Sequence, residues 1–159
     1  MNRRLMLSLV ISLLTSVIAV IGATPASAAV DISRFRNFAD SGKCLDGYLA
    51  KGPYVTACNT GEFQQWTWNR DPNVLTPMRH VQSAHCLAAS ETHPGRLLFE
   101  TCSDGFDPYQ RWDIRIPAGG WAFLYNVGAR ACVSYRGGET VQTIPCNDNG
   151  DGTQRWRPE

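Results

Sequence analysis

A short signal that ends in tryptophan occurs three times in this chain of 159 residues, with its copies 46 and 44 residues apart. The copies are Gln64-Gln65-Trp66, Gln110-Arg111-Trp112 and Gln154-Arg155-Trp156. A repeat of this length cannot bury its own apolar face, so units that recur at a fixed period must stack against one another. The spacing therefore predicts three equivalent units that share one core.

A pair of cysteines precedes each signal, and the members of a pair lie 14, 16 and 14 residues apart. Six cysteines allow 15 pairings, among which sequence alone does not choose. Their recurrence at one phase of the repeat favours three local bridges, Cys44 to Cys58, Cys86 to Cys102 and Cys132 to Cys146. Zinc is the alternative, but there is no Cys-x-x-Cys, and the histidines lack ligand spacing. We expect no metal and no cofactor.

Between these landmarks the chain consists of short apolar runs separated by turn residues such as Lys51-Gly52-Pro53 and Arg136-Gly137-Gly138. Frequent turns of this kind indicate many short strands. The sequence alternates around the motif tryptophans, as in Trp66-Thr67-Trp68, which places one side chain inward and the next outward. A third landmark also recurs, at Phe35–Phe38, Met78–Val81 and Leu124–Val127. The predicted fold class is all-β.

The N-terminus has the pattern of a secretory signal peptide. Arg3 and Arg4 precede an apolar run from Leu5 to Ile21, and Ala26-Ser27-Ala28 forms a small-residue cleavage site. We expect a signal peptide at 1–28 and a secreted, extracellular domain at 29–159 with no membrane span; a membrane anchor is the alternative. Loss of the two arginines moves the formal charge from +1 to −1, which does not favour nucleic-acid or anionic-membrane binding.

From about Phe35 to Trp156 the chain resembles the ricin B-type lectins, whose β-trefoil fold has three repeats that each end in Gln-x-Trp. The resemblance implies a β-trefoil with repeats at about 33–72, 73–118 and 119–159. It also places Trp66, Trp112 and Trp156 in the shared core and gives each motif glutamine the role of tying strands together. A buried ring and a buried amide serve these roles on physical grounds as well.

The resemblance also implies where a sugar would bind. In family members that bind sugar, an Asp lies two residues after the first cysteine and a Gln four before the second. An aromatic ring lies two residues before the second cysteine, and an Asn precedes the motif Gln. An aromatic face stacks on the pyranose, while the carboxylate and amides bind its hydroxyls.

The first repeat keeps half of this pattern, with Asp46 and Gln64 in place. The other three positions carry Tyr54, Thr56 and Phe63. A nearby tyrosine is expected to supply a substitute stacking surface. The predicted carbohydrate site therefore consists of Asp46, Gln64, Tyr48 and Tyr54. The alternative is that Asp46 caps a turn and the tyrosines cover the barrel.

The other repeats depart further from the pattern. The second has Ala88, Leu98 and Glu100 at the Asp, Gln and ring positions, which predicts no sugar site. The third keeps two amides but has Ser134 in place of the Asp, so it lacks the charge-assisted hydrogen bonds of a carboxylate. Its weaker candidate site is Gln142, Gln154 and Tyr135.

The sequence contains no constellation typical of an enzyme: Gly-x-Ser-x-Gly, His-Glu-x-x-His and a phosphate loop are all missing. The leading hypothesis is a secreted carbohydrate-binding module that binds a glycan or glycoconjugate without catalysis. The alternative is a trefoil that binds a separately encoded protein, similar to the binding subunits of cytolethal distending toxins or to trefoil protease inhibitors.

Overall fold

The computed structural model describes residues 30–147 and 150–159. The predicted signal peptide lies outside the described residues. The described chain folds into strands and two short 3-10 helices, η1 and η2. In order these are β1 (Val30–Ser33), β2 (Phe35–Asn37), β3 (Lys43–Tyr48), β4 (Gly52–Ala57), η1 (Glu62–Gln64), β5 (Trp66–Asn69), β6 (Arg79–His80), β7 (Cys86–Ala89), β8 (Leu97–Glu100), η2 (Pro108–Gln110), β9 (Trp112–Arg115), β10 (Phe123–Asn126), β11 (Ala131–Tyr135), β12 (Val141–Ile144) and β13 (Trp156–Pro158).

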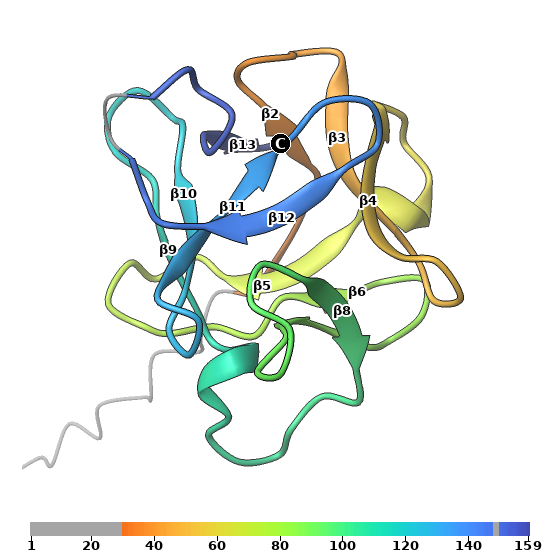
Figure 1. Cartoon of the computed structure of the whole chain (residues 1–159), viewed down its shortest axis with the longest axis vertical. Helices are drawn as coiled ribbons and strands as arrows, with labels where there is room; N and C mark the ends of the chain where they lie inside the picture. Colours follow the sequence, from red (N-terminus) through yellow and green to blue (C-terminus); the bar gives the residue numbers. More distant parts are fainter. Residues whose placement is uncertain (1–29, 148–149) are drawn as a thin grey trace, which may run out of the picture.

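After β1, every repeat contributes four strands, and the repeats occupy three sectors around a common centre. In Figure 1 the first repeat (orange to yellow) lies at the upper right, the second (green) below and the third (blue) at the upper left. Each repeat ends with the motif tryptophan at the start of its fourth strand, β5, β9 or β13. The predicted all-β, β-trefoil fold is confirmed.

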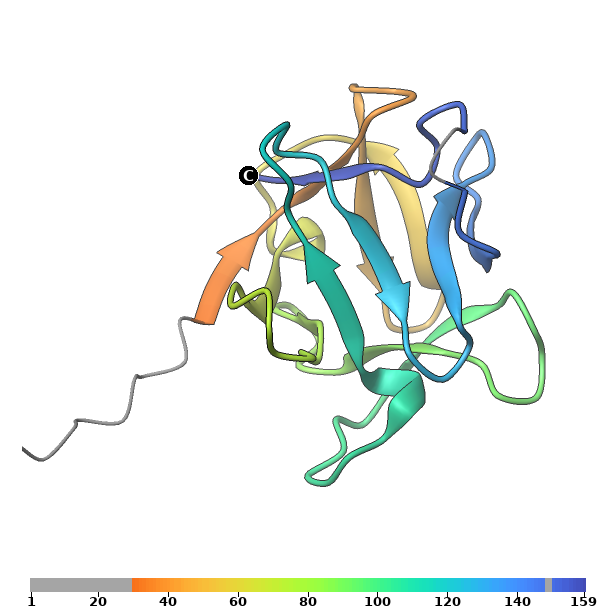
Figure 2. The same ribbon diagram turned by 90° about the vertical axis from the view of Figure 1, so that its left-hand side faces the viewer.

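Strand pairing links each repeat to the next. The sheets have the orders β1-β5-β6-β7-β8, β12-β11-β10-β9 and β13-β2-β3-β4. Each sheet thus combines three strands of one repeat with the last strand of the repeat before it. The pairing of β13 with β2 closes the circle, and Figure 2 shows the C-terminal segment running alongside the first repeat. No repeat is complete without its neighbour.

The three motif tryptophans lie at the centre of the fold and are fully buried. The indole Nε1 of each donates a hydrogen bond to the carbonyl of the residue after the first cysteine of its repeat, at 3.3, 2.9 and 2.9 Å. A buried indole N–H needs such a partner, so these bonds fix the ring as well as satisfy it. Trp68, which lies outside the motif, is buried too, whereas Trp121 is only partly buried.

The three local disulfides are formed as the repeat symmetry predicts. Cys44–Cys58, Cys86–Cys102 and Cys132–Cys146 each join the second strand of a repeat to the segment after its third strand, and none of the described cysteines is free. Each bridge closes a loop of similar length, for which chain-entropy models give roughly 3 kcal/mol. Among the described residues, no helix has the length and apolar character needed to cross a membrane.

Candidate functional site

The three motif glutamines are structural in every repeat. Each is buried, and its Oε1 accepts from the backbone N–H of the residue after the second cysteine, at 2.7, 2.9 and 2.7 Å. Each Nε2 donates to the carbonyl of the residue before that cysteine, at 2.9, 3.1 and 2.9 Å. The bonds fasten the disulfide to the motif, so the glutamines by themselves carry no evidence of a ligand.

A second threefold contact joins the repeats to one another. Asn37, His80 and Asn126 hold one equivalent position, and all three are buried. Each donates a side-chain N–H to the carbonyl of the residue before the motif glutamine of the preceding repeat, at 2.9, 3.0 and 2.7 Å. His80 thus supports Phe63 of the first repeat. Burial holds the pKa of His80 below its usual range, so the ring is neutral at pH 7.

In the first repeat the predicted carboxylate is present but covered. Asp46 on β3 is only 2% exposed, and its Oδ2 accepts from Gln64 Nε2 at 2.8 Å. Its Oδ1 is buried with no hydrogen-bond partner within the described chain. A buried carboxylate costs free energy unless it is paired, and the Tyr54 hydroxyl interacts with this one.

Tyr54 is the group that covers this carboxylate. It faces Asp46 across the β3–β4 pair, and burial, followed by the Asp46 carboxylate, raises its pKa to about 12. The ammonium of Lys51 lies 3.9 Å from the centre of the Tyr54 ring and forms a 2.6 Å ion pair with Glu139 of the third repeat. The first-repeat position is therefore filled by the protein's own side chain, which the neighbouring repeat helps to hold.

The remaining predicted member of this site, Tyr48, lies at the exposed end of β3. Tyr48 is 51% exposed, and its ring lies 6.0 Å from that of Phe63, which is 38% exposed. Phe63 occupies the position where the family has its Asn, and sequence reasoning did not select it as a stacking group. An aromatic residue directly before the motif glutamine was the sequence signal that could have identified Phe63 as a stacking group. Tyr48 and Phe63 form an apolar surface beside the covered carboxylate.

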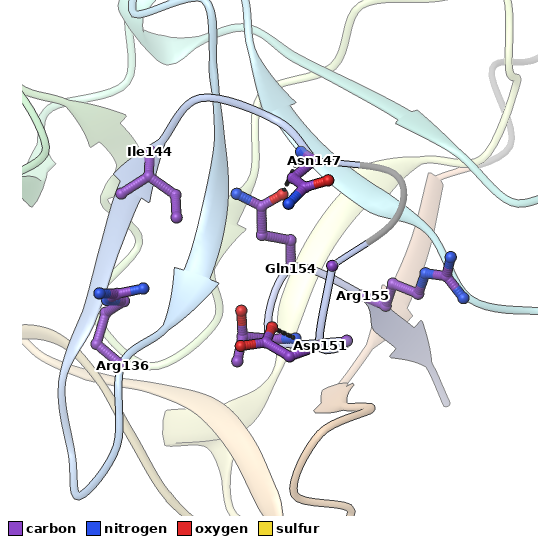
Figure 3. Close-up of a pocket in the computed structure, with 9 residues that line it drawn as sticks. Arg136, Ile144, Asn147, Asp151, Gln154 and Arg155 are labelled. Carbon is purple, nitrogen blue, oxygen red and sulfur yellow. Dashed lines mark hydrogen bonds between the residues drawn. The ribbon is translucent and has the colours of Figure 1, made fainter.

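At the position that Tyr54 covers in the first repeat, the third repeat has an open pocket. Its volume is about 160 Å³, and it lies between the β11–β12 hairpin and the motif loop. The lining residues are Arg136, Ile144, Asn147, Gly150, Asp151, Gly152, Thr153, Gln154 and Arg155. Figure 3 shows Arg136 and Ile144 on the hairpin side, with Asp151 and Gln154 across from them. Ile144, Thr153 and Gln154 hold the ring, Asn and Gln positions of the family pattern.

This pocket obtains its carboxylate from a position that the family pattern does not include. Asp151 Oδ1 accepts from the Thr153 backbone N–H at 3.0 Å. Hydrogen bonds from Thr153, followed by the charge of Arg136, lower the pKa of Asp151, so the group is ionised at neutral pH. Sequence reasoning missed Asp151 and Arg136 because it considered only the family positions. An acid in the short, glycine-rich segment between Cys146 and Gln154 was the signal.

The other candidates of the third repeat lie beside the pocket rather than on its lining. Gln142 is on β12, paired in register with Ser134, and is partly buried. Ser134 is fully buried, and its Oγ lies 3.2 Å from Thr153 Oγ1. The Tyr135 hydroxyl donates to the Gly138 carbonyl at 3.5 Å. Of the three predicted residues, only Gln154 lines the pocket.

The second repeat uses its altered positions for structure. Gln110 Nε2 donates to Glu100 Oε2 at 3.1 Å, so Glu100 takes the part that Asp46 plays in the first repeat. Ala88 is buried. Phe99 turns toward the first repeat, where its ring stacks 5.8 Å from Trp66 and covers Gly47. In residues 30–147 and 150–159, no group of three His, Cys, Asp or Glu is placed to hold a metal.

Comparison with known proteins agrees with this geometry. The family model of the ricin-type beta-trefoil lectin domain matches residues 32–156. The designed threefold-symmetric protein ThreeFoil is similar with a TM-score of 0.67 and 16% identity, over 80% of this chain and 96% of that one. A search of curated protein sequences gives no match.

Two natural proteins among the solved structures share the fold. The beta-trefoil lectin of the Vibrio vulnificus hemolysin/cytolysin, solved with N-acetyl-D-lactosamine bound, has a TM-score of 0.60 and 22% identity over 82% of this chain and 94% of that one. The cytolethal distending toxin from Actinobacillus actinomycetemcomitans has a chain with a TM-score of 0.64 and 15% identity over 80% and 89%. Identities this low establish the fold alone.

Proposed function

Because this chain belongs to the family of ricin-type β-trefoil lectin domains, we propose that it is a secreted carbohydrate-binding module that acts by reversible recognition, without catalysis. The observation that carries the proposal is the open pocket of the third repeat, which holds Asp151 and Arg136 beside the motif glutamine. The Vibrio vulnificus lectin with bound N-acetyl-D-lactosamine supports a glycan as the class of ligand.

The pocket offers the groups that a sugar residue requires. The Asp151 carboxylate accepts hydrogen bonds from hydroxyl groups in fixed directions, and the Arg136 guanidinium donates to ring or glycosidic oxygens. Ile144 gives an apolar wall for the carbon face of a pyranose. Since about 160 Å³ is below the roughly 300–1,000 Å³ of most ligand pockets, we expect one sugar residue to enter. The affinity should be weak, near millimolar, about −4 kcal/mol.

The first-repeat group of Asp46, Gln64, Tyr48 and Tyr54 is proposed as a second sugar site, ranked below the pocket. A sugar hydroxyl reaches Asp46 Oδ1 only after the Tyr54 side chain moves away, which breaks its contact with Lys51. The exposed pair of Tyr48 and Phe63 would then stack on the ring. The free energy of displacing Tyr54 reduces the affinity of this site relative to one that is already open.

The experiment is a glycan array probed with the mature protein, followed by binding curves for two variants. Asp151→Asn should weaken glycan binding at least tenfold, because it removes the charged acceptor. Asp107→Asn is the matched control: Asp107 lies at the equivalent position in the second repeat and accepts from the Tyr109 N–H at 2.9 Å in the same way. Binding should survive in this control. A folded protein that binds no glycan, or equal loss in both variants, contradicts the proposal.

Secretion rests on the sequence of the N-terminal segment, with Ala26-Ser27-Ala28 as the cleavage site. N-terminal sequencing of the exported protein should give a start at Ala29 or Val30. Retention of Met1 on a membrane-bound product contradicts this part of the proposal. Three disulfides are consistent with an oxidising compartment.

A second candidate function is binding of a separately encoded protein. The observation that favours it is the exposed apolar group of Tyr48, Leu49 and Phe63 over a covered carboxylate. Aromatic groups of this kind are enriched at protein interfaces. A secreted nuclease encoded beside this gene, whose co-purification is lost in Phe63→Asp but retained in Phe106→Asp, favours this function. Phe106 is a suitable control because it is exposed on another repeat.

A further inference from the structure

Four side chains outside the repeat-equivalent sugar positions form a continuous row of ring and guanidinium contacts, here named the aromatic–arginine strip. Arg155 lies 6.0 Å from the Phe38 ring centre, Phe38 meets Trp121 edge to face at 4.9 Å, and Arg157 lies 5.8 Å from the Trp121 ring. Phe38 directly follows β2, Trp121 lies shortly before β10, and Arg155 and Arg157 lie just before and within β13. The closure of the trefoil brings them together, since β13 pairs with β2 and Trp156 bridges to Ala122.

The strip faces the solvent. Phe38 is 46% exposed, Trp121 is partly exposed, and the burial of Trp156 between them turns Arg155 and Arg157 outward. The carboxylate two residues beyond Arg157, that of Glu159, is engaged by Arg34 and Arg36 at 2.9 and 2.7 Å. The strip therefore presents two aromatic rings and the exposed guanidinium of Arg157 on a protein with little net charge.

The strip is continuous with the third-repeat pocket. Gly152 and Arg155 line the pocket, and both also contact Phe38. A Cβ at Gly152 would lie 2.3 Å from Phe38 Cδ1, so the ring packs directly on the backbone of the pocket loop. Figure 3 shows the Arg155 side chain pointing away from Asp151, out of the pocket. A ligand longer than one sugar residue that leaves the pocket on this side passes over the strip.

We propose that the aromatic–arginine strip is a subsite for an anionic sugar residue of the glycan whose neighbouring residue occupies the third-repeat pocket. The inference rests on the proposed function. A guanidinium binds a carboxylate or a sulfate through two parallel hydrogen bonds, and an aromatic ring packs on the apolar face of a pyranose. Sialic acid and sulfated sugars share this chemistry. A saccharide is favoured over a nucleic acid because the mature chain has no basic excess.

The test measures binding of the mature protein to N-acetyllactosamine and to its sialylated and sulfated forms by titration calorimetry. At least one anionic form should bind about tenfold more tightly than the neutral one, and added salt should reduce the difference. Arg157→Gln and Trp121→Ala should remove the preference and leave neutral binding unchanged. Arg111→Gln is the matched control, since Arg111 lies 6.0 Å from the exposed Phe106 ring, and it should keep the preference.

The outcomes separate this inference from the proposed function. Equal binding of neutral and anionic forms contradicts the proposal that the strip is an anionic subsite. Loss of neutral binding in Asp151→Asn would still support sugar binding in the pocket. A preference that survives Arg157→Gln but is lost in Arg136→Gln places the anionic group inside the pocket and also overturns the strip. If Trp121→Ala does not fold, the Arg157→Gln variant, which alters an exposed side chain, decides whether the strip binds the anionic sugar. Failure of all three oligosaccharides to bind overturns the subsite proposal for this glycan series, while the glycan array still decides the proposed function.

Discussion

The first and third repeats have the same arrangement of strands but differ at the position two residues after the first cysteine, where the family pattern has its Asp. The first repeat keeps the carboxylate, Asp46, and buries it under Tyr54. The third repeat has a buried serine there and leaves the space open, with a carboxylate supplied by the loop residue Asp151. A residue that matches the family pattern and an accessible site are therefore separate properties, and in this molecule they fall in different repeats.

The difference has a simple steric and electrostatic cause. A tyrosine on β4 is large enough to reach across the strand pair to Asp46, and Lys51 packs on its outer face. In the third repeat, Gln142 pairs with Ser134 at the corresponding register, where there is no carboxylate to cover. Burial in one repeat and solvent access in the other should give the two carboxylates different energetic roles.

The largest expected effect is the loss of stability when a motif tryptophan is removed, which tests whether the two repeats depend on the same scaffold. Trp66→Ala and Trp156→Ala should each lower the free energy of unfolding by about 3–5 kcal/mol, because each removes a fully buried ring and its indole hydrogen bond. Urea unfolding with the disulfides intact measures both. An unchanged midpoint in either variant shows that this repeat does not depend on its tryptophan.

A smaller effect separates the two carboxylates. Asp46→Ala should destabilise the protein by about 1–3 kcal/mol, because it removes the buried acceptor of Gln64 Nε2 and the carboxylate beside Tyr54. Asp151→Asn should leave the unfolding midpoint in place, because its side chain is exposed. Urea unfolding of both variants provides the comparison. If Asp46→Ala is as stable as the wild type, the buried carboxylate is retained for binding rather than for folding.

The smallest effect concerns the residues that support the two sites. His80 holds the carbonyl of Phe63 in the first repeat, whereas Asn37 holds that of Thr153 in the third. Since the pKa of His80 is lowered in the folded state, its contribution is present above the unfolded pKa of about 6.5 and is lost as the pH falls toward the folded value.

Acidification from pH 7 to about pH 5.5 should therefore lower the stability of the wild type more than that of His80→Asn. The substitution gives the first site the same kind of support as the third. Denaturant titrations at the two pH values measure the difference. Parallel pH profiles for the two proteins would assign the acid sensitivity to other groups.

The sequence by itself determined the scaffold. A period of about 45 residues, a cysteine pair and a Gln-x-Trp in each unit were enough to predict three units with a shared core, three bridges and buried tryptophans, and the resemblance to ricin B-type lectins that these motifs carry implied the β-trefoil. These features follow from sequence because each repeat makes the same local hydrogen bonds, so one pattern is stated three times.

Only the tertiary structure decided which position is open. Whether Asp46 meets solvent depends on the Tyr54 side chain and on an ion pair with Glu139, 88 residues beyond Lys51, which no local pattern encodes. Asp151 and Arg136 line one pocket from different loops, and the closure of the circle by β13 joins Phe38 to Trp121, Arg155 and Arg157. Local hydrogen bonds repeat with the sequence, whereas the access to a surface site is set by side chains that converge from different repeats.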